Sequence, residues 1–264
     1  MKKHFFTNSK KIKSGRAPRK AIYILPNFFT TCSLFCAFYS IIASFNGYFN
    51  KAAWAILIST VFDWLDGKIA RMSRSMSQFG VEYDSLSDLI AFGVAPGLLI
   101  YTWALTPFGR VGWLAAFLFV ACAALRLARF NVNNSNTELK YFQGLPSPGA
   151  GGMVATTVIL AYQLGWVDIS KHIPILFLTF FLSFMMVSKI RYQSIKKLEF
   201  TGTIPFPILV VTLCVIIIIA AEPQFTLFTV FFLYVFSGPV LALKRKFLAM
   251  RKEVPEKKEV DAKG

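Results

Sequence analysis

The chain has 264 residues, of which 55% are hydrophobic and only 16% are charged. Soluble domains carry about 25% charged residues, so this composition excludes an ordinary water-soluble fold, as well as disorder, collagen and disulfide-rich scaffolds. The 29 Lys and Arg against 13 Asp and Glu give a formal charge of +16, which in a soluble protein would suggest a nucleic-acid partner. A membrane protein explains the same excess, because its cytoplasmic segments are basic, and no nucleic-acid partner is then expected.

Eight apolar stretches are each long enough to cross about 30 Å of hydrocarbon. They fall at residues 22–44, 52–72, 85–106, 111–130, 149–166, 173–190, 204–221 and 224–242. The sequence therefore predicts an all-α, polytopic integral membrane protein of about eight transmembrane helices. Its membrane domain is expected over residues 22–243, between a basic tail at 1–21 and a charged tail at 244–264. Both tails are polar and short of apolar residues, so they are expected to be disordered.

The distribution of Lys and Arg provides a test of this topology. With both termini in the cytoplasm, 26 of the 29 basic residues fall on the cytoplasmic side, and the other three are Lys51, Arg110 and Lys171. Shifting the topology by one helix would remove this separation. We therefore expect a protein of the cell (inner) membrane with both termini cytoplasmic.

The four cysteines all lie inside apolar stretches, without a Cys-x-x-Cys pair or a nearby His. They are Cys32, Cys36, Cys122 and Cys214. The pattern indicates buried packing thiols rather than disulfides or metal ligands.

Four carboxylates fall within the expected membrane helices: Asp63, Asp66, Asp84 and Asp88. A charged Asp at the bilayer centre costs about 2.5–3.5 kcal/mol, so the group requires a compensating cation. The first two, at i and i+3, share one helix face, and the last two, at i and i+4, share another. A hairpin that turns at residues 72–79 would bring the two pairs together.

An all-oxygen ligand set without His or Cys favours a hard cation, Mg²⁺ or Mn²⁺. Two such ions held by shared carboxylates suit phosphoryl transfer. The small residues Gly67, Ala70 and Gly80 leave space beside the acids, and Arg71 could bind a phosphate. Paired aspartates also occur in cation transporters and proton relays, and spacing alone leaves that alternative open.

Residues 63–88 resemble the signature of the CDP-alcohol phosphatidyltransferases, D-x2-D-G-x2-A-R-x8-G-x3-D-x3-D, at every fixed position. The resemblance implies the fold of that family and an enzyme that displaces CMP from a CDP-linked lipid with an alcohol, and it suggests a homodimer. It implies that Asp63 and Asp84 bridge two Mg²⁺ or Mn²⁺ ions and that Asp66 completes one ion site. Asp88 would complete the other and accept the proton of the attacking hydroxyl.

The same resemblance implies a set of contacts to the CDP-lipid. The residues concerned are Asn27, Thr30, Gly67, Arg71, Ser77 and Gly80. The first two lie in Pro26-Asn27-Phe28-Phe29-Thr30, which is similar to a P-N-x-x-T motif of the family. A helix start with a proline and a polar cap is the alternative explanation of this segment.

Stretches at 88–96, 126–131, 142–148 and 186–189 resemble the serine-using branch of the family. This implies that CDP-diacylglycerol and L-serine give phosphatidylserine and CMP. Arg126 and Arg129 share a helix face and could bind the serine carboxylate, although basic anchors at the membrane surface explain them equally. Close helix packing likewise explains the glycines at 149, 151 and 152. Glycerol 3-phosphate, inositol phosphate and choline remain alternative acceptors, and an inactive homologue is a further alternative.

Overall fold

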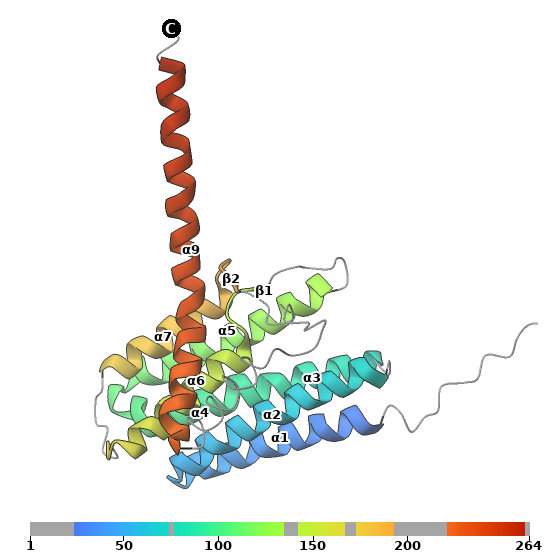
Figure 1. The fold of residues 1–264 in the computed structure, drawn as a ribbon. Coiled ribbons are helices and arrows are strands. Elements are labelled where there is room, and N and C mark those ends of the chain that lie inside the picture. The colour runs from blue at the N-terminus through green and yellow to red at the C-terminus, as the bar shows by residue number, and fades with distance from the viewer. Residues whose placement is uncertain (1–23, 74–76, 135–141, 167–172, 193–220, 262–264) are drawn as a thin grey trace, which may run out of the picture.

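The computed structural model describes residues 24–73, 77–134, 142–166, 173–192 and 221–261 (Figure 1). Almost all of them are helical, as expected. The helices are α1 (Ile24–Phe45), α2 (Phe49–Ser73), α3 (Gln78–Leu89), α4 (Ala95–Ile100), α5 (Arg110–Asn134), α6 (Ser147–Gln163), α7 (Ile173–Val187) and α9 (Pro223–Asp261). Two strands of two residues each, β1 (Phe142–Gln143) and β2 (Arg191–Tyr192), pair antiparallel. Apart from this small ribbon, the described residues fit the all-α expectation.

Helices α1 and α2 form an antiparallel hairpin with a closely packed, partly polar interface. Ser33 and Ser59 are both buried, and their hydroxyl oxygens lie 2.8 Å apart. Each hydroxyl also lies within hydrogen-bonding distance of the other residue's carbonyl oxygen. Small residues and paired hydroxyls allow close contact between helices in an apolar environment, where burial of aliphatic surface gives little net attraction.

A single helical path runs from Gln78 to Phe108, with two π-helical segments inside it. The first covers Ile90–Val94, and there the N–H of Ala95 donates to the carbonyl of Ile90, five residues back. Pro96 explains this position, because proline has no N–H to donate and its ring clashes with the carbonyl four residues earlier. Two glycines of this path face α5, since a Cβ at Gly93 would lie 3.2 Å from Ala123 Cβ and one at Gly97 would lie 2.9 Å from Val120 Cγ2.

Helix α6 packs through the glycines near its start. A Cβ at Gly149 would lie 2.9 Å from the ring of Tyr234, and one at Gly151 would lie 3.3 Å from Phe92 Cα. At Gly152 a Cβ would overlap the ring of Phe231. Close helix packing therefore explains the three glycines without a role in the site.

The ribbon connects the α6 side of the molecule to α9. The N–H of Gly144, which follows β1 with φ +84°, donates to the carbonyl of Ile190 at 2.8 Å. In β2, Tyr192 is 1% exposed and its hydroxyl donates to the carbonyl of Val235 at 3.0 Å. Burial raises the pKa of Tyr192 to about 12, so it stays a neutral donor at physiological pH.

Among the described residues, four helical segments are long and apolar enough to cross a membrane. They are Leu25–Phe45, Gln78–Phe108, Arg110–Val132 and Pro223–Lys244. Helix α2 is not among them, and α6 and α7 have only 17 and 15 residues. The expected span at 204–221 and the tail at 1–21 lie outside the described residues. An integral membrane protein is thus supported, whereas the expected eight spans are not confirmed.

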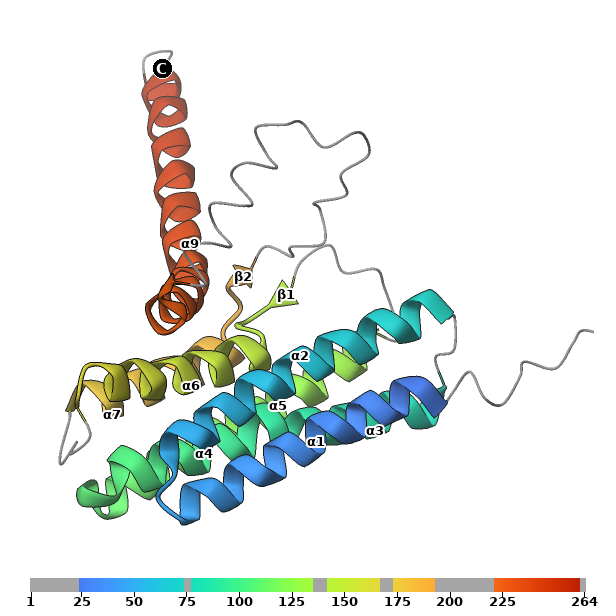
Figure 2. The same cartoon turned by 60° about the horizontal axis from the view of Figure 1, so that its bottom comes forward.

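One end of the bundle exposes aromatic side chains with a polar group. Tyr48, Trp113 and Trp166 are exposed at the α1–α2 turn, the start of α5 and the end of α6. These three ends lie on one side of the molecule, at the left in Figure 2. Exposed Tyr and Trp at a common level are typical of a membrane–water interface.

Helix α9 crosses the other helices steeply in both views instead of running beside them (Figures 1 and 2). It continues to Asp261, so the expectation of a disordered tail from residue 244 is wrong for most of that segment.

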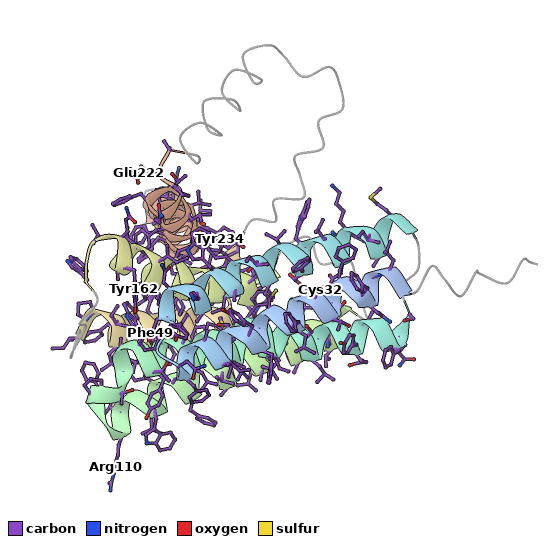
Figure 3. The ribbon with its side chains drawn as sticks, turned by 90° about the horizontal axis from the view of Figure 1, so that it is seen from below. Cys32, Phe49, Arg110, Tyr162, Glu222 and Tyr234 are labelled. Atoms are coloured by element: carbon purple, nitrogen blue, oxygen red, sulfur yellow. The ribbon has the colours of Figure 1, made fainter. Side chains whose placement is uncertain are left out.

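The described cysteines carry free thiols. Cys122 is buried, and Cys32 (Figure 3) and Cys36 are half-buried on α1. Cys214 lies outside the described residues. The prediction of packing thiols is confirmed for Cys122, and the two cysteines on α1 are more accessible than expected.

Candidate active site

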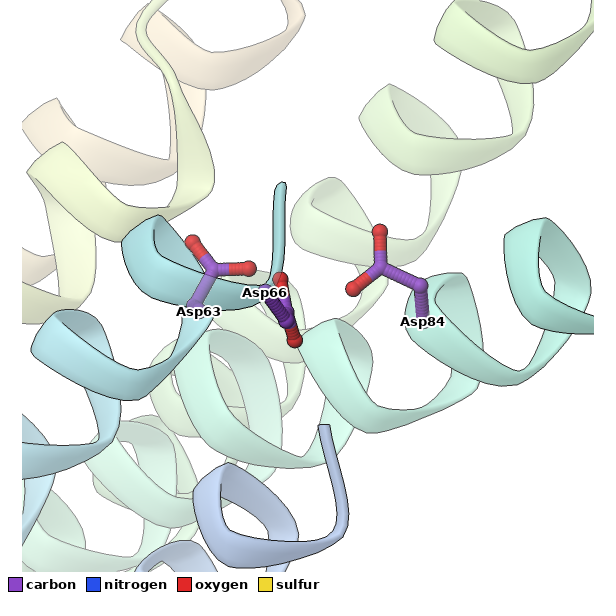
Figure 4. Close-up of side chains that lie close together, drawn as sticks. All are labelled: Asp63, Asp66 and Asp84. Atoms are coloured by element: carbon purple, nitrogen blue, oxygen red, sulfur yellow. The ribbon is translucent and has the colours of Figure 1, made fainter. Parts of the chain in front are cut away.

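Three of the four predicted aspartates come together in the structure. Asp63 and Asp66 of α2 and Asp84 of α3 each present a carboxylate oxygen, and these oxygens all lie within 4.8 Å of one another. The three carboxyl groups point toward a common space (Figure 4). The hairpin geometry predicted from the spacing is therefore present.

Asp88 lies one helical turn beyond Asp84 and belongs to the same group of acids. Its carboxyl group is hydrogen-bonded to that of Asp63. Two carboxylates at this distance repel each other unless a proton or a cation lies between them. The arrangement thus concentrates negative charge at one place.

One carboxylate oxygen of this cluster has no protein partner. Asp66 is 4% exposed, and no described residue forms a hydrogen bond with its Oδ2. The Thr30 hydroxyl and the backbone N–H of Gly67 interact with the Asp66 carboxylate. Thr30 also lies 3.1 Å from the carbonyl of Pro26, and its single proton can serve only one of the two acceptors.

These observations test whether the residues fit a divalent cation. A buried, unpaired carboxylate oxygen costs free energy unless a ligand satisfies it. The cluster offers several converging oxygens and no softer donor, which is the set that Mg²⁺ and Mn²⁺ prefer. The aspartates therefore fit the metal that the sequence implies.

Arg71 is placed as its spacing predicts. Its guanidinium group lies against Gly67, where a Cβ would be 3.4 Å from Nη1. It also interacts electrostatically with Asp63. A cationic fork thus lies on the α2 side of the acidic cluster.

The predicted contacts at the start of α3 also come together. Ser77 caps this helix, because its Oγ accepts the N–H of Gly80 at 3.0 Å. A Cβ at Gly80 would lie 3.1 Å from this oxygen and 3.3 Å from Oδ1 of Asn27. Asn27, Ser77 and Gly80 therefore share one small space, and helix capping gives Ser77 a structural role of its own.

Thr30 links α1 to α3 beside Asp66. Its carbonyl oxygen accepts a hydrogen bond from the buried hydroxyl of Ser87 at 3.2 Å. This bond joins α1 to α3 directly beside the aspartates. The backbone of Thr30 is thereby held next to α3, and its hydroxyl interacts with Asp66.

Arg126 of α5 lies beside the cluster. Its guanidinium group interacts with Asp88 and Asp63, and its Nη1 donates to Oγ of Ser147 at 2.6 Å. Arg129, one turn further along α5, is half-buried. Helix α5 is also connected to α3 through Asn131, whose Nδ2 donates to Ser85 Oγ at 2.9 Å.

The sequence that forms this site matches a known protein family. Residues 23–181 match the family model described as CDP-alcohol phosphatidyltransferase. The chain belongs to the CDP-alcohol phosphatidyltransferase family. Every aspartate of the cluster, together with Asn27 and Arg126, lies within the matched residues.

Several relatives of this phosphatidyltransferase have serine in their names. The CDP-diacylglycerol–serine O-phosphatidyltransferase of Helicobacter pylori is 39% identical over 184 residues, which cover 69% of this chain and 77% of that protein. The archaetidylserine synthase of Methanothermobacter thermautotrophicus is 36% identical over 190 residues, 71% of this chain and 74% of that protein. The Bacillus subtilis CDP-diacylglycerol–serine O-phosphatidyltransferase is 34% identical over 175 residues, 66% of this chain and 92% of that protein.

Two residues that interact with Arg126 beside the aspartates of this phosphatidyltransferase were not predicted from the sequence. Ser147 lies in a stretch with family resemblance, but nothing in its neighbours indicates that it accepts a hydrogen bond from Arg126. Tyr234 interacts electrostatically with Arg126 from α9, far outside the matched residues. Only the three-dimensional path of α9 could reveal the second.

Proposed function

We propose that this phosphatidyltransferase transfers the phosphatidyl group of CDP-diacylglycerol to the hydroxyl of L-serine, giving phosphatidylserine and CMP. The observation that carries the proposal is the convergence of Asp63, Asp66 and Asp84 beside Arg126. Acids suited to hold cations at a diphosphate then lie next to a cation suited to hold the carboxylate of serine. The names of the relatives from Helicobacter and Bacillus support the same acceptor.

The four aspartates would hold two divalent cations, Mg²⁺ or Mn²⁺, with Asp63 and Asp84 shared between them. When bound, such ions neutralise the diphosphate and stabilise the departing CMP. The fit rests on the buried, unpaired oxygen of Asp66 and on the all-oxygen donor set.

Asp88 is the proposed general base. A serine hydroxyl is a weak nucleophile at neutral pH, and a positioned carboxylate can accept its proton as the oxygen attacks phosphorus. Asp88 lies at the boundary between the acidic cluster and Arg126. A serine whose carboxylate binds Arg126 would therefore have its hydroxyl within the range of Asp88.

The CDP moiety is assigned to the α1 and α2 side of the cluster. Asn27, Ser77 and Gly80 converge there, and the missing side chain of Gly80 keeps the space open. Thr30 lies beside Asp66 on the same side. Arg71, lying over Gly67, would bind the diphosphate with a planar fork of N–H donors.

Serine is assigned to the α5 side, where Arg126 and Arg129 lie. Their charges would attract the carboxylate, and the neighbouring acids would attract the ammonium group. Acceptors that carry a phosphate in place of a carboxylate lack this combination of groups.

A purified-protein assay tests this assignment. CMP release from CDP-diacylglycerol should depend on L-serine, stop on chelation by EDTA and return with Mg²⁺ or Mn²⁺. The same preparation should release little CMP with glycerol 3-phosphate, inositol phosphate or choline. Release that does not require serine, or that is faster with another acceptor, would overturn the serine assignment.

We further propose that residues 22–243 form the membrane domain of a homodimer in the cell membrane, with both termini cytoplasmic. In the eight-span topology expected from the sequence, 26 of the 29 basic residues fall on the cytoplasmic side, which supports this orientation. A fluorescent reporter fused after Gly264 should fold and fluoresce in the cytoplasm. Periplasmic alkaline phosphatase activity from a fusion at the same position would contradict the orientation. Cross-linking in membranes should yield a dimer, and a monomer alone would contradict the homodimer.

A further inference from the structure

Helix α9 places one tyrosine beside the Arg126 side of the active site. Tyr234 lies where α9 crosses the other helices (Figure 3). Its ring covers Gly149, with Cε1 2.9 Å from the position that a Cβ would occupy. Gly149 is two residues from Ser147, the hydrogen-bond acceptor of Arg126. The phenol and the guanidinium group lie close enough to interact electrostatically.

The orientation of Tyr234 is fixed by a second tyrosine. The rings of Tyr192 and Tyr234 have centroids 5.9 Å apart, and the Tyr192 hydroxyl donates to the carbonyl of the adjacent Val235 at 3.0 Å. Gly238 leaves room for the Tyr192 ring, because any side chain there would overlap it. The buried β2 residue therefore holds this turn of α9 against α6.

The chemistry of the pair limits what the Tyr234 hydroxyl can do. Arginine has five N–H donors and no acceptor, so the phenol cannot donate its proton to Arg126. The proton must be donated to another acceptor. An anion held by the guanidinium group would provide one, since a carboxylate accepts several hydrogen bonds.

We propose that Tyr234 is a specificity residue of the acceptor site, where it donates a hydrogen bond to the serine carboxylate that Arg126 binds. This rests on the proposed function and adds to it a residue from outside the family-matched region. The nearby Asp63 and Asp88 repel a carboxylate, so two donors on the opposite side give the acceptor one orientation, with its hydroxyl toward the acids. An alcohol without a carboxylate cannot bind these two donors and is not oriented in this way.

Steady-state kinetics of Tyr234→Phe tests the proposal, because this change removes the hydroxyl and keeps the ring that packs on Gly149. We expect the KM for L-serine to rise about tenfold, as for a lost hydrogen bond to a charged group. The KM for CDP-diacylglycerol and the unfolding temperature should stay near those of the wild type. Tyr39→Phe, which removes an exposed phenol hydroxyl on α1, is the matched control and should change none of these values.

A second acceptor separates carboxylate recognition from a general effect on the site. L-serinamide keeps the hydroxyl and the ammonium group but lacks the carboxylate. Tyr234→Phe should leave the turnover of L-serinamide unchanged, so that the preference of the enzyme for serine over serinamide falls about tenfold.

An unchanged serine KM in Tyr234→Phe, or equal losses with serine and serinamide, would overturn the role of Tyr234 while leaving the proposed function intact. Absence of serine-dependent CMP release from the wild type would instead overturn the proposed function itself.

Discussion

Helices α1 to α3 and the path that continues α3 are built differently at their two ends. At the packing end, defined by Ala43, Ala52, Ala53 and Ile56, the side chains are at most 2% exposed and make apolar contacts. At the acidic end, defined by the four aspartates, the same helices bring like charges together and leave an oxygen of Asp66 unpaired. The first arrangement stabilises the fold by itself, whereas the second is stable only with a ligand. A site can therefore be recognised where a well-packed protein gathers several like charges and leaves an oxygen of one of them without a partner.

The largest effect is expected from removing a carboxylate that two cations would share. Asp63→Asn or Asp84→Asn should lower CMP release by at least about 10³-fold, because cation binding supplies several kcal/mol and each 1.36 kcal/mol is tenfold in rate. Metal binding, measured by calorimetry, should weaken in parallel. Glu82→Gln, an exposed acid on the same helix as Asp84, is the control and should retain activity.

A smaller loss is expected at the proposed general base. Asp88→Asn should lower kcat by about 10²–10³-fold while CDP-diacylglycerol still binds, since only proton transfer is removed. Single-turnover kinetics and lipid binding measured together would separate the two steps. Wild-type turnover in this variant would exclude Asp88 as the base.

Loss of the Arg126 side chain should weaken binding of the acceptor serine more than binding of the CDP-lipid. Arg126→Ala should raise the KM for serine about 10- to 100-fold, consistent with loss of a charge-assisted contact, and change the KM for CDP-diacylglycerol much less. Arg110→Ala, at an exposed position on the start of the same helix, is the control. Equal changes in both KM values would exclude a role of Arg126 in serine binding and leave it only its interaction with the aspartates.

At the packing end, the expected effect is on stability instead of activity. Ala53 is fully buried, and Ala53→Leu should cost about 1–3 kcal/mol by overpacking. Thermal unfolding in detergent should show a lower midpoint, with both KM values unchanged in the remaining folded enzyme. Ile58→Leu, on an exposed face of α2, should have no comparable effect, and a similar loss there would weaken the comparison.

The smallest expected effect is an increase in stability where the previous variant loses it. Asp66→Asn removes one of the clustered charges, so in EDTA the unfolding midpoint should stay constant or rise by a few degrees. With Mg²⁺ present, the wild type should be stabilised and the variant much less so. A large loss of stability in EDTA would mean that the acidic end contributes to folding without a cation.

The sequence was sufficient for the core of the site because that part is local. Asp63 and Asp66 on one helix and Asp84 on the next can be placed by helix periodicity and one turn, and the structure brings them together as predicted. The contact between Arg71 and Gly67 is equally local, one turn along α2.

Long-range features could not be predicted in the same way. The crossing of α9, which brings Tyr234 to Arg126, depends on the glycines of α6 and on Tyr192 in a two-residue strand. Periodicity within α9 shows which residues share a face, but not which helix that face meets. The helical state of most of the C-terminal tail was missed because composition alone indicated disorder.

The π-helical segment at Ile90–Val94 controls the helical phase between the acids and the glycines of its own helix. In a regular α-helix, Gly97 would be rotated about 180° from Asp88, and the extra residue of a π turn reduces this to about 80°. Asp88, Gly93 and Gly97 then form one stripe, which α5 follows in antiparallel register: Val120 meets Gly97, Ala123 meets Gly93, and Arg126 reaches Asp88. A backbone irregularity caused by one proline thus sets which cation faces the proposed base.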